Sequence, residues 1–213
     1  MRAETVSALA FWCPMNAEPD STWLLESPHR SQMLEFECVA VRSGRTRVAG
    51  VDEVGRGPLA GPLVAAAVLL AHPIQGVDDS KKLTEAAREG LFEEITAGPH
   101  LFALESVEPA EIDRIGVQQA NFLAMKRAAE ALSPVPDFLL VDGFEIRGCA
   151  IPQVSLVKGD ARAQSIAAAS IVAKVTRDRL MCEMARLHPE YGFDHHKGPA
   201  TRAHPGARAQ PAP

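Results

Sequence analysis

Three apolar runs in this chain each stop at acidic residues that have a glycine close by. The runs read VAGVDEVG, DFLLVDG and QVSLVKGD, and the acids are Asp52, Glu53, Asp142 and Asp160. Short apolar runs bounded by turn residues are typical of buried strands, and open α/β sheets bind ligands at the carboxyl ends of their strands. The pattern therefore predicts that four carboxylates meet at one edge of a sheet.

Each of these acids also has an ordinary structural explanation. Asp and Gly are common turn formers, so a single Asp-Gly pair after a strand is most often only a turn, and Asp160 could simply cap the segment that follows it. Asp52 and Glu53 are adjacent, so they would point to opposite faces of a continuing strand. A shared site therefore requires the strand to end or bend there, which Gly55 permits.

Four carboxylates at one place would repel one another and would need a positive counter-charge. A divalent cation supplies that charge, and ligands that are all oxygen atoms favour Mg²⁺ or Mn²⁺ over zinc. The four cysteines are scattered without Cys-x-x-Cys pairs, which indicates neither a zinc site nor a disulfide framework. The sequence thus favours a magnesium or manganese site.

The rest of the chain alternates between strand-like and helix-like patterns. We expect strands over 47–53, 63–70 and 101–107 and in the DFLLVDG and QVSLVKGD runs, and helices after the N-cap Thr84, over 109–132 with a break near Gly116, and over 163–187. The side chains that recur at helical spacing in the second helix and should lie in the core are Phe122, Met125, Ala129 and Leu132. The first two strands should pair antiparallel. This order predicts an α/β fold with a mixed sheet flanked by helices.

The chain divides into three zones. Residues 1–46 show no clear period and form an N-terminal extension of unknown structure, while residues 47–197 hold the alternating elements. Residues 198–213 are rich in Ala and Pro, offer little to bury and should be disordered. No apolar run approaches the roughly 20 residues that span a bilayer, and the N-terminus makes a poor secretory signal. A reducing cytoplasm therefore fits the sequence.

Charge is distributed unevenly along the chain. The net charge of −5 argues mildly against a nucleic-acid partner, but residues 1–142 carry a balance of −9 and residues 143–213 a balance of +4. The second part could present a basic surface. A solvated surface with uneven charge explains the count equally well.

The chain resembles ribonuclease HII. The segments that carry the resemblance follow the family's order over roughly residues 47–198 and read VAGVDEVGRGPLAGPLVAAAV, DDSKKLTEAAREGLFEEI, LLVDG, VKGD, SIAAASIVAKVTRD and HPEYGFDHHKG. The resemblance implies a ribonuclease H-like fold. It also implies an endonuclease that hydrolyses the RNA strand of RNA–DNA hybrids and cuts at single ribonucleotides in duplex DNA, leaving 3′-hydroxyl and 5′-phosphate ends.

The resemblance also implies roles for individual residues. It places the four active-site acids at Asp52, Glu53, Asp142 and Asp160, where two Mg²⁺ or Mn²⁺ ions would activate water and stabilise the leaving oxygen. The residues it implies as substrate contacts are Gly55, Arg56, Gly57, Lys81, Lys82 and Tyr191, with Ser165 and Lys174 as weaker candidates. It implies a cytoplasmic enzyme, expected to be a monomer, that acts on hybrids and on DNA containing ribonucleotides.

Two departures from the family pattern leave other functions open. The family begins a few residues before the first motif, so Met33 is an alternative start, and Pro199 stands where the family continues with a tyrosine and a further basic segment. We therefore expect that the family's C-terminal segment is missing. The alternatives are a catalytically weak or vestigial hybrid-binding protein and a phosphoesterase acting on small molecules.

Overall fold

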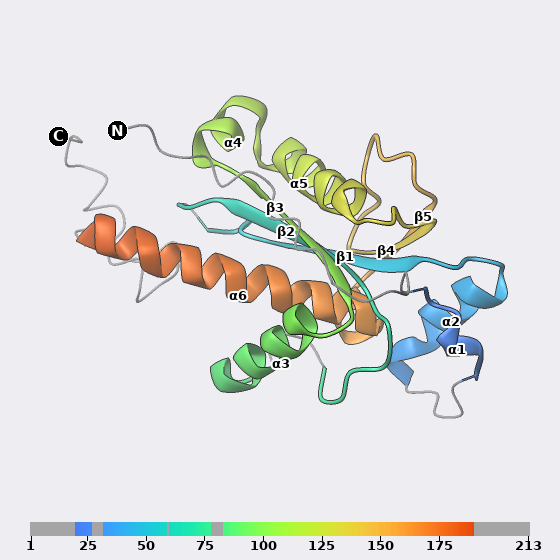
Figure 1. The fold of residues 1–213 in the computed structure, drawn as a ribbon. Helices are drawn as coiled ribbons and strands as arrows, with labels where there is room; N and C mark the ends of the chain where they lie inside the picture. The colour runs from blue at the N-terminus through green and yellow to red at the C-terminus, as the bar shows by residue number, and fades with distance from the viewer. Residues whose placement is uncertain (1–19, 27–31, 59, 78–82, 190–213) are drawn as a thin grey trace.

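The computed structural model describes residues 20–26, 32–58, 60–77 and 83–189. Its centre is a mixed five-stranded sheet with the order β3-β2-β1-β4-β5 (Figure 1). The strands are β1 (Val48–Val54), β2 (Leu63–Leu69), β3 (Leu101–Val107), β4 (Phe138–Asp142) and β5 (Gln153–Leu156). Strand β1 pairs antiparallel with β2 and parallel with β4, so it lies at the middle of the sheet. The predicted fold class is confirmed.

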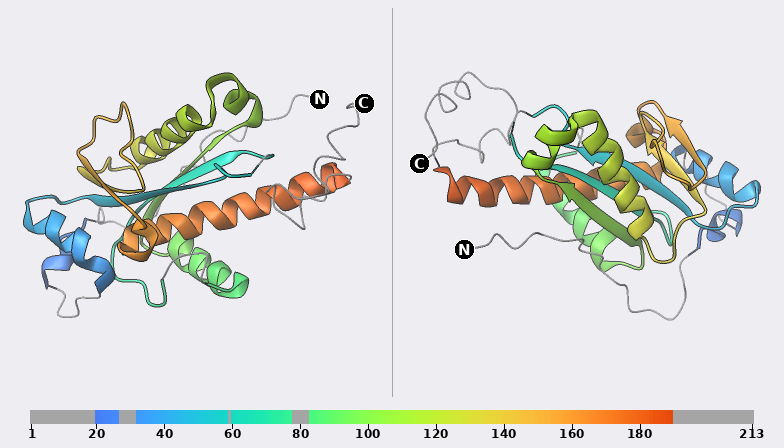
Figure 2. Two further views of the ribbon diagram at one scale, coloured as in Figure 1. Left: turned by 180° about the vertical axis from the view of Figure 1, so that it is seen from behind. Right: turned by 90° about the horizontal axis from the view of Figure 1, so that it is seen from above.

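Helices cover both faces of the sheet. Helices α4 (Pro109–Ile115) and α5 (Val117–Ala131) lie on one face, and α3 (Glu85–Ala97) and the long α6 (Gln164–Leu187) lie on the other, as the two views in Figure 2 show. Each face has its own hydrophobic cluster, because alternate residues of β1 and β2 point to opposite sides. None of the helices in the described ranges is long and apolar enough to cross a membrane.

The helices follow the sequence signals closely. The hydroxyl of Thr84 accepts a hydrogen bond from the backbone N–H of Ala87 at 3.2 Å, so the predicted N-cap of α3 is confirmed. The predicted break near Gly116 separates α4 from α5, and this glycine has a φ of 84°. The four residues of α5 and its C-cap that were predicted as core are all buried.

The N-terminal zone, which the sequence left without an assigned structure, forms short helices against the sheet. These are α1 (Trp23–Glu26), the 3₁₀ turn η1 (Gln32–Leu34) and α2 (Glu35–Arg42). Trp23 donates its indole N–H to the carbonyl of Leu70 at 3.0 Å. The side-chain hydroxyl of Ser21 accepts the backbone N–H of Val48 at 3.0 Å, at the start of β1.

Helix α2 also reaches the beginning of α6 through a buried carboxylate. Glu37 is 2% exposed, and its Oε1 accepts hydrogen bonds from the backbone N–H of Ser165 at 2.9 Å and from the Ser165 hydroxyl at 2.7 Å. Helix α6 has no cap from its own N-cap residue, Ala163. Glu37 therefore satisfies one of the N–H groups that a helix start leaves without an intrahelical partner.

Replacement of Glu37 is expected to change how stability depends on pH. Burial raises the pKa of Glu37 and outweighs the hydrogen bonds from Ser165, so the folded state favours the neutral carboxyl. Its contribution to stability is therefore greatest below about pH 4.3, the unfolded value, and declines as pH rises toward the folded pKa. Glu37→Gln removes this decline but keeps an acceptor for Ser165.

Urea unfolding at pH 5 and pH 8 tests this expectation. Glu37→Ala should cost about 2–3 kcal/mol, because it removes a buried acceptor and leaves a void. Glu37→Gln should gain stability relative to the unsubstituted protein as pH rises from 5 to 8. A Gln variant that loses as much stability as the Ala variant at pH 8 would contradict the assigned role.

Candidate functional site

Asp52 and Glu53 lie where β1 continues beyond its pairing with β4. The parallel pairs end at Val51, whereas the antiparallel pairs with β2 run on to Val54. The predicted strand end at Glu53 is displaced by one residue, because β1 runs to Val54, and the chain turns at Gly55, with a φ of 109°, as the sequence indicated. Among the residues that the structure describes, no strand pairs with the β4 side of β1 beyond Val51, and both carboxylates interact electrostatically with Asp142.

Asp142 and Asp160 come to this region from β4 and from the turn after β5. Asp142 is the last residue of β4, as predicted, and its Oδ1 accepts the backbone N–H of Gly159 at 2.6 Å. Asp160 does not close a strand: β5 ends at Leu156, and Asp160 lies in the 3₁₀ turn η2 (Gly159–Ala161), where it is 5% exposed. The hydrogen bond between Asp142 and Gly159 brings the two acid-bearing segments together.

Three of these carboxylates act on one another electrostatically. Burial raises the pKa of Asp52 well above its usual range, and the charges of Glu53 and Asp142 raise it further. Burial also raises the pKa of Glu53, while the Arg56 guanidinium lowers it and Asp142 raises it again. Burial and mutual repulsion therefore disfavour the charged forms of these carboxyl groups, and a bound cation would stabilise the charged forms.

Ser170 is a part of this site that sequence reasoning missed. Its side chain makes a hydrogen bond to Asp52 and lowers that residue's pKa. Small residues at the start of α6 are typical of a helix that packs closely against another element, but they do not identify the partner. Knowing that α6 packs against β1 would have been necessary, because Ser170 and Asp52 are far apart in the sequence.

The donor set suits a hard divalent cation, but the side chains are not arranged around one. In the ranges that the structure describes, no group of three or more His, Cys, Asp or Glu side chains could hold a metal ion as placed. Asp52 accepts the backbone N–H of Glu53 at 2.7 Å, and Glu53 faces Arg56 at 3.4 Å. The acids offer only oxygen atoms as ligands, so they fit Mg²⁺ or Mn²⁺ chemically, and their side chains would have to rotate to assemble a full coordination shell.

The predicted Gly-Arg-Gly turn directly follows these acids. A Cβ on Gly55 would lie 2.7 Å from the carbonyl oxygen of Pro62, so this position requires glycine. Arg56 is exposed, and its guanidinium lies 3.4 Å from Glu53 Oε1 and 3.4 Å from Gln118 Oε1 of α5. Gly57 is exposed and has open space around it. The structure therefore brings all three residues to the rim of the acid cluster.

Arg177 supports the turn from below, and the sequence did not identify it. This side chain of α6 is 2% exposed and donates to the carbonyl of Pro62 at 2.9 Å and to that of Ala60 at 3.0 Å. Buried carbonyl groups lose free energy when they lack a donor. Arg177 therefore fixes the segment between Ala60 and Pro62, which faces Gly55.

Arg177→Met is expected to destabilise the protein by about 1–3 kcal/mol, because two carbonyls lose their donor while the apolar stem is kept. The stability of Arg177→Lys should lie between those of the unsubstituted protein and Arg177→Met, because one ammonium group cannot reproduce the two-pronged guanidinium contact. Thermal unfolding measures the order of stability. Equal stability of the Met and Lys variants would show that the two carbonyl contacts contribute little.

The other predicted substrate contacts are not seen at the acid cluster in the part of the chain that the structure describes. Lys81, Lys82 and Tyr191 lie outside the described residues. Ser165 is bound to Glu37, and Lys174 forms an ion pair with Asp178 at 2.7 Å on α6. Neither side chain is brought to the acid cluster by the contacts described.

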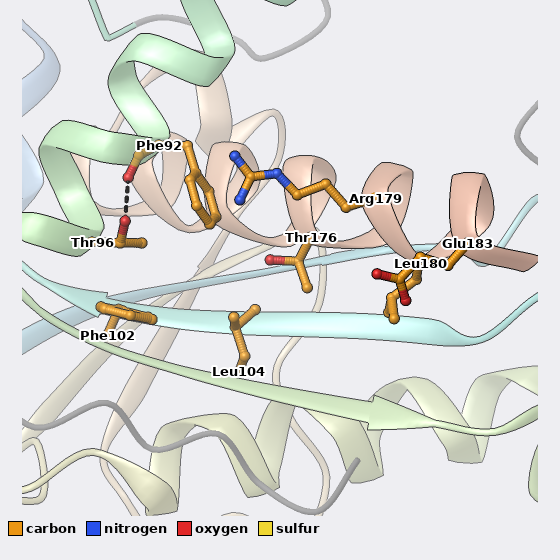
Figure 3. Close-up of a pocket in the computed structure, with 8 residues that line it drawn as sticks. All are labelled: Phe92, Thr96, Phe102, Leu104, Thr176, Arg179, Leu180 and Glu183. Atoms are coloured by element: carbon orange, nitrogen blue, oxygen red, sulfur yellow. Dashed lines mark hydrogen bonds between the residues drawn. The ribbon is translucent and has the colours of Figure 1, made fainter. Parts of the chain in front are cut away.

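An apolar cavity of about 380 Å³ lies away from the acids, between α3, β3 and α6. Figure 3 shows Phe102 and Leu104 pointing into it from β3, and the Arg179 guanidinium stands over the ring of Phe92, 4.4 Å from its centroid. None of the residues that line this cavity belongs to the acid cluster. The cavity is therefore separate from the candidate site.

The matching family model and two similar proteins carry the same description. The family model described as Ribonuclease HII matches residues 49–210. A protein described as ribonuclease HII from Desulfitobacterium hafniense is 49% identical over 183 residues, which cover 85% of this chain and 70% of that protein. One of the same description from Geobacter sulfurreducens is 46% identical over 195 residues, covering 91% of this chain and 90% of the relative.

A solved structure also resembles this chain. The crystal structure of the ribonuclease H2 from Pyrococcus horikoshii OT3 superposes with a TM-score of 0.62 at 31% sequence identity. The match covers 73% of this chain and 82% of the other. The mixed sheet and its flanking helices are therefore shared with a structurally known enzyme.

Proposed function

The chain belongs to the ribonuclease HII family, and on that premise we propose that it hydrolyses the RNA strand of RNA–DNA hybrids. We also propose that it nicks duplex DNA at single embedded ribonucleotides, leaving 3′-hydroxyl and 5′-phosphate ends. The observation that carries this proposal is geometric: Asp52 and Glu53 lie where β1 extends past its pairing with β4, and β4 ends there at Asp142. The Asp142 carboxylate accepts the N–H of Gly159, beside Asp160. A buried cluster of like charges is poised for divalent cations and, through them, for a phosphodiester.

In the proposed mechanism Asp52, Glu53, Asp142 and Asp160 would hold two Mg²⁺ or Mn²⁺ ions. Asp52 would serve both ions, Glu53 and Asp142 one of them, and Asp160 the other. When bound, the ions supply a water that is nucleophilic near neutral pH and positive charge for the leaving oxygen. The hydrogen bond from Ser170 supports this role, because it restrains the direction of the Asp52 carboxylate.

Recognition of the substrate is assigned to the rim of the cluster. Gly55 and Gly57 would let the backbone approach a minor groove, where a 2′-hydroxyl distinguishes RNA from DNA. Arg56 would contribute charge there, and Lys81 and Lys82 would contact phosphates. Tyr191 would pack near the scissile junction. We propose that the protein acts as a monomer in the cytoplasm.

A second candidate, a hybrid-binding protein with weak catalysis, is favoured by one observation. The described acids do not form a group of three that could hold a metal ion as placed. Adding Mg²⁺ or Mn²⁺ to the protein with an end-labelled duplex containing one ribonucleotide separates the two functions. Metal-dependent nicking on the 5′ side of the ribonucleotide supports the enzyme, whereas binding without cleavage in either metal supports the second candidate. Hydrolysis of small phosphodiesters in preference to the duplex would support neither.

A further inference from the structure

Two strongly exposed apolar side chains lie beside the acid-bearing turns. Phe144 is 61% exposed and follows Asp142 by two residues, and Val157 is 71% exposed and precedes Asp160 by three. Single exposed apolar residues are normal on a protein surface. These two are unusual because the fold brings both segments to the same end of the sheet, next to the candidate site.

The pairing of β4 with β5 sets this juxtaposition. Asp142 pairs with Leu156, and the backbone N–H of Gly143 donates to the carbonyl of Leu156 at 3.0 Å. The N–H of Phe144 then donates to the carbonyl of Asp142 at 2.9 Å, which closes a tight turn around Gly143, with a φ of 73°. This turn fixes where the chain carries Phe144 relative to the Asp142 carboxylate.

One cation lies beside the ring of Phe144, and two more lie on the neighbouring turn after β5. The Arg56 guanidinium lies 6.0 Å from the centroid of its ring. Lys158 is exposed, directly follows Val157 and has a φ of 55°, a left-handed backbone that is uncommon for a residue other than glycine. Arg162 donates to the carbonyl of Val157 at 3.3 Å. An exposed aromatic ring close to a cation is a combination with which proteins hold a nucleic-acid strand.

We propose that Phe144 is a substrate-binding residue that packs its ring against a nucleotide of the bound duplex, with Val157 extending the same apolar surface. This inference rests on the proposed function and adds a contact to the same site. Arg56 and Lys158 attract the phosphates, and the ring contributes an apolar contact that no cation can make. The Arg56 guanidinium beside the ring favours an anionic partner over an apolar protein surface.

The test measures affinity apart from cleavage. Binding of a labelled RNA–DNA hybrid is followed in EDTA for the unsubstituted protein, Phe144→Ala and Val135→Ala. Val135 is 49% exposed and lies near the opposite end of β4, so it is a matched control. Phe144→Ala should weaken binding about tenfold, which lies within the range for loss of a stacking aromatic, and Val135→Ala should leave it unchanged.

Two further readouts identify the contact as direct and apolar. The slope of log affinity against log salt should be the same for Phe144→Ala as for the unsubstituted protein, because no phosphate contact is lost. Phe144→Trp should bind the hybrid as the unsubstituted protein does, and addition of the hybrid should quench its extra indole fluorescence. Val135→Trp should show no extra quenching.

The possible failures can be told apart. If the unsubstituted protein neither binds nor cleaves the hybrid, the proposed function fails. If it does both while Phe144→Ala binds within twofold and Phe144→Trp shows no extra quenching, only the role of Phe144 is overturned. A loss of affinity accompanied by a shallower salt slope would also overturn it, because the change would then act through the neighbouring cations.

Discussion

Asp52→Asn is expected to lower the rate of hybrid cleavage by at least about a thousandfold while the protein stays folded. The substitution removes the carboxylate proposed to bridge both ions, and metal ions contribute several kcal/mol of transition-state stabilisation, each 1.4 kcal/mol being a factor of ten in rate. The asparagine has the same shape and still offers an oxygen to the Glu53 N–H. Single-turnover cleavage in Mg²⁺ and in Mn²⁺ measures the loss.

The same variant is expected to be more stable than the unsubstituted protein in the absence of metal. The pKa of Asp52 is raised by burial and by Glu53 and Asp142, so folding favours the neutral form. The stability that Asp52 contributes is present below its unfolded pKa, near 3.9, and is lost as pH rises toward the folded value. Urea unfolding in EDTA should therefore show a gain for Asp52→Asn that grows from pH 4 toward neutrality.

Asp137→Asn provides a matched control with the opposite behaviour. Burial acts to raise the pKa of Asp137, but hydrogen bonds from Thr46 and Arg47 outweigh burial and lower it. Its contribution is therefore present above the unfolded pKa and is lost as pH falls. Asp137→Asn should cost about 1 kcal/mol at neutral pH and keep full cleavage activity. Near-normal turnover by Asp52→Asn would remove Asp52 from the catalytic centre.

The sequence predicted the secondary structure well where the physical signal is local. β3 matches the expected 101–107, and Gly116 separates two helices because its positive φ interrupts the helical path. The N-terminal zone could not be assigned, because α1 and α2 are short and are held by distant partners. Trp23 depends on Leu70, and Glu37 depends on Ser165.

The sequence predicted which residues belong to the candidate site better than it predicted where the fold places them. The rule that acids follow apolar runs found Asp142 at the end of β4, but it misplaced Asp160, which follows β5 by a turn. It required β1 to end or bend near Glu53, but it could not show that, in the described residues, the pairs with β4 stop at Val51 while the pairs with β2 run on to Val54. Asymmetric pairing of this kind depends on tertiary structure, so no single segment encodes it.

Gly50→Ala is expected to have the largest effect on folding of any substitution in the first motif. Strand β1 crosses the start of α6 at Gly50, and a Cβ there would overlap the backbone of Ser165 and of Ile166. Backbone atoms inside a packed core cannot yield as a flexible side chain can. Overpacking typically costs 1–3 kcal/mol, and this contact should reach at least the upper end, about 3 kcal/mol, because two elements would have to separate.

Gly50→Ala should also disturb the acid cluster, because the contact between β1 and α6 lies close to both Asp52 and Asp160. Gly50 is two residues before Asp52, and Ser165 is five residues after Asp160, so a displaced α6 would move both acid-bearing segments. Ser170, which holds Asp52, lies on the same helix. A Gly50→Ala protein that still folds should therefore cleave more slowly at saturating substrate, as well as melting at a lower temperature.

Gly57→Ala is the matched comparison, because it separates a glycine required by the fold from one proposed for recognition. No atom lies within 4 Å of a Cβ at this position, so thermal stability should change little. If the backbone at Gly57 approaches the substrate, the added methyl group should weaken hybrid binding while the saturated rate is largely retained. Equal melting temperatures for Gly50→Ala and Gly57→Ala would mean that β1 and α6 can separate at little cost. The close crossing could then no longer explain how β1 holds Asp52 against Ser170.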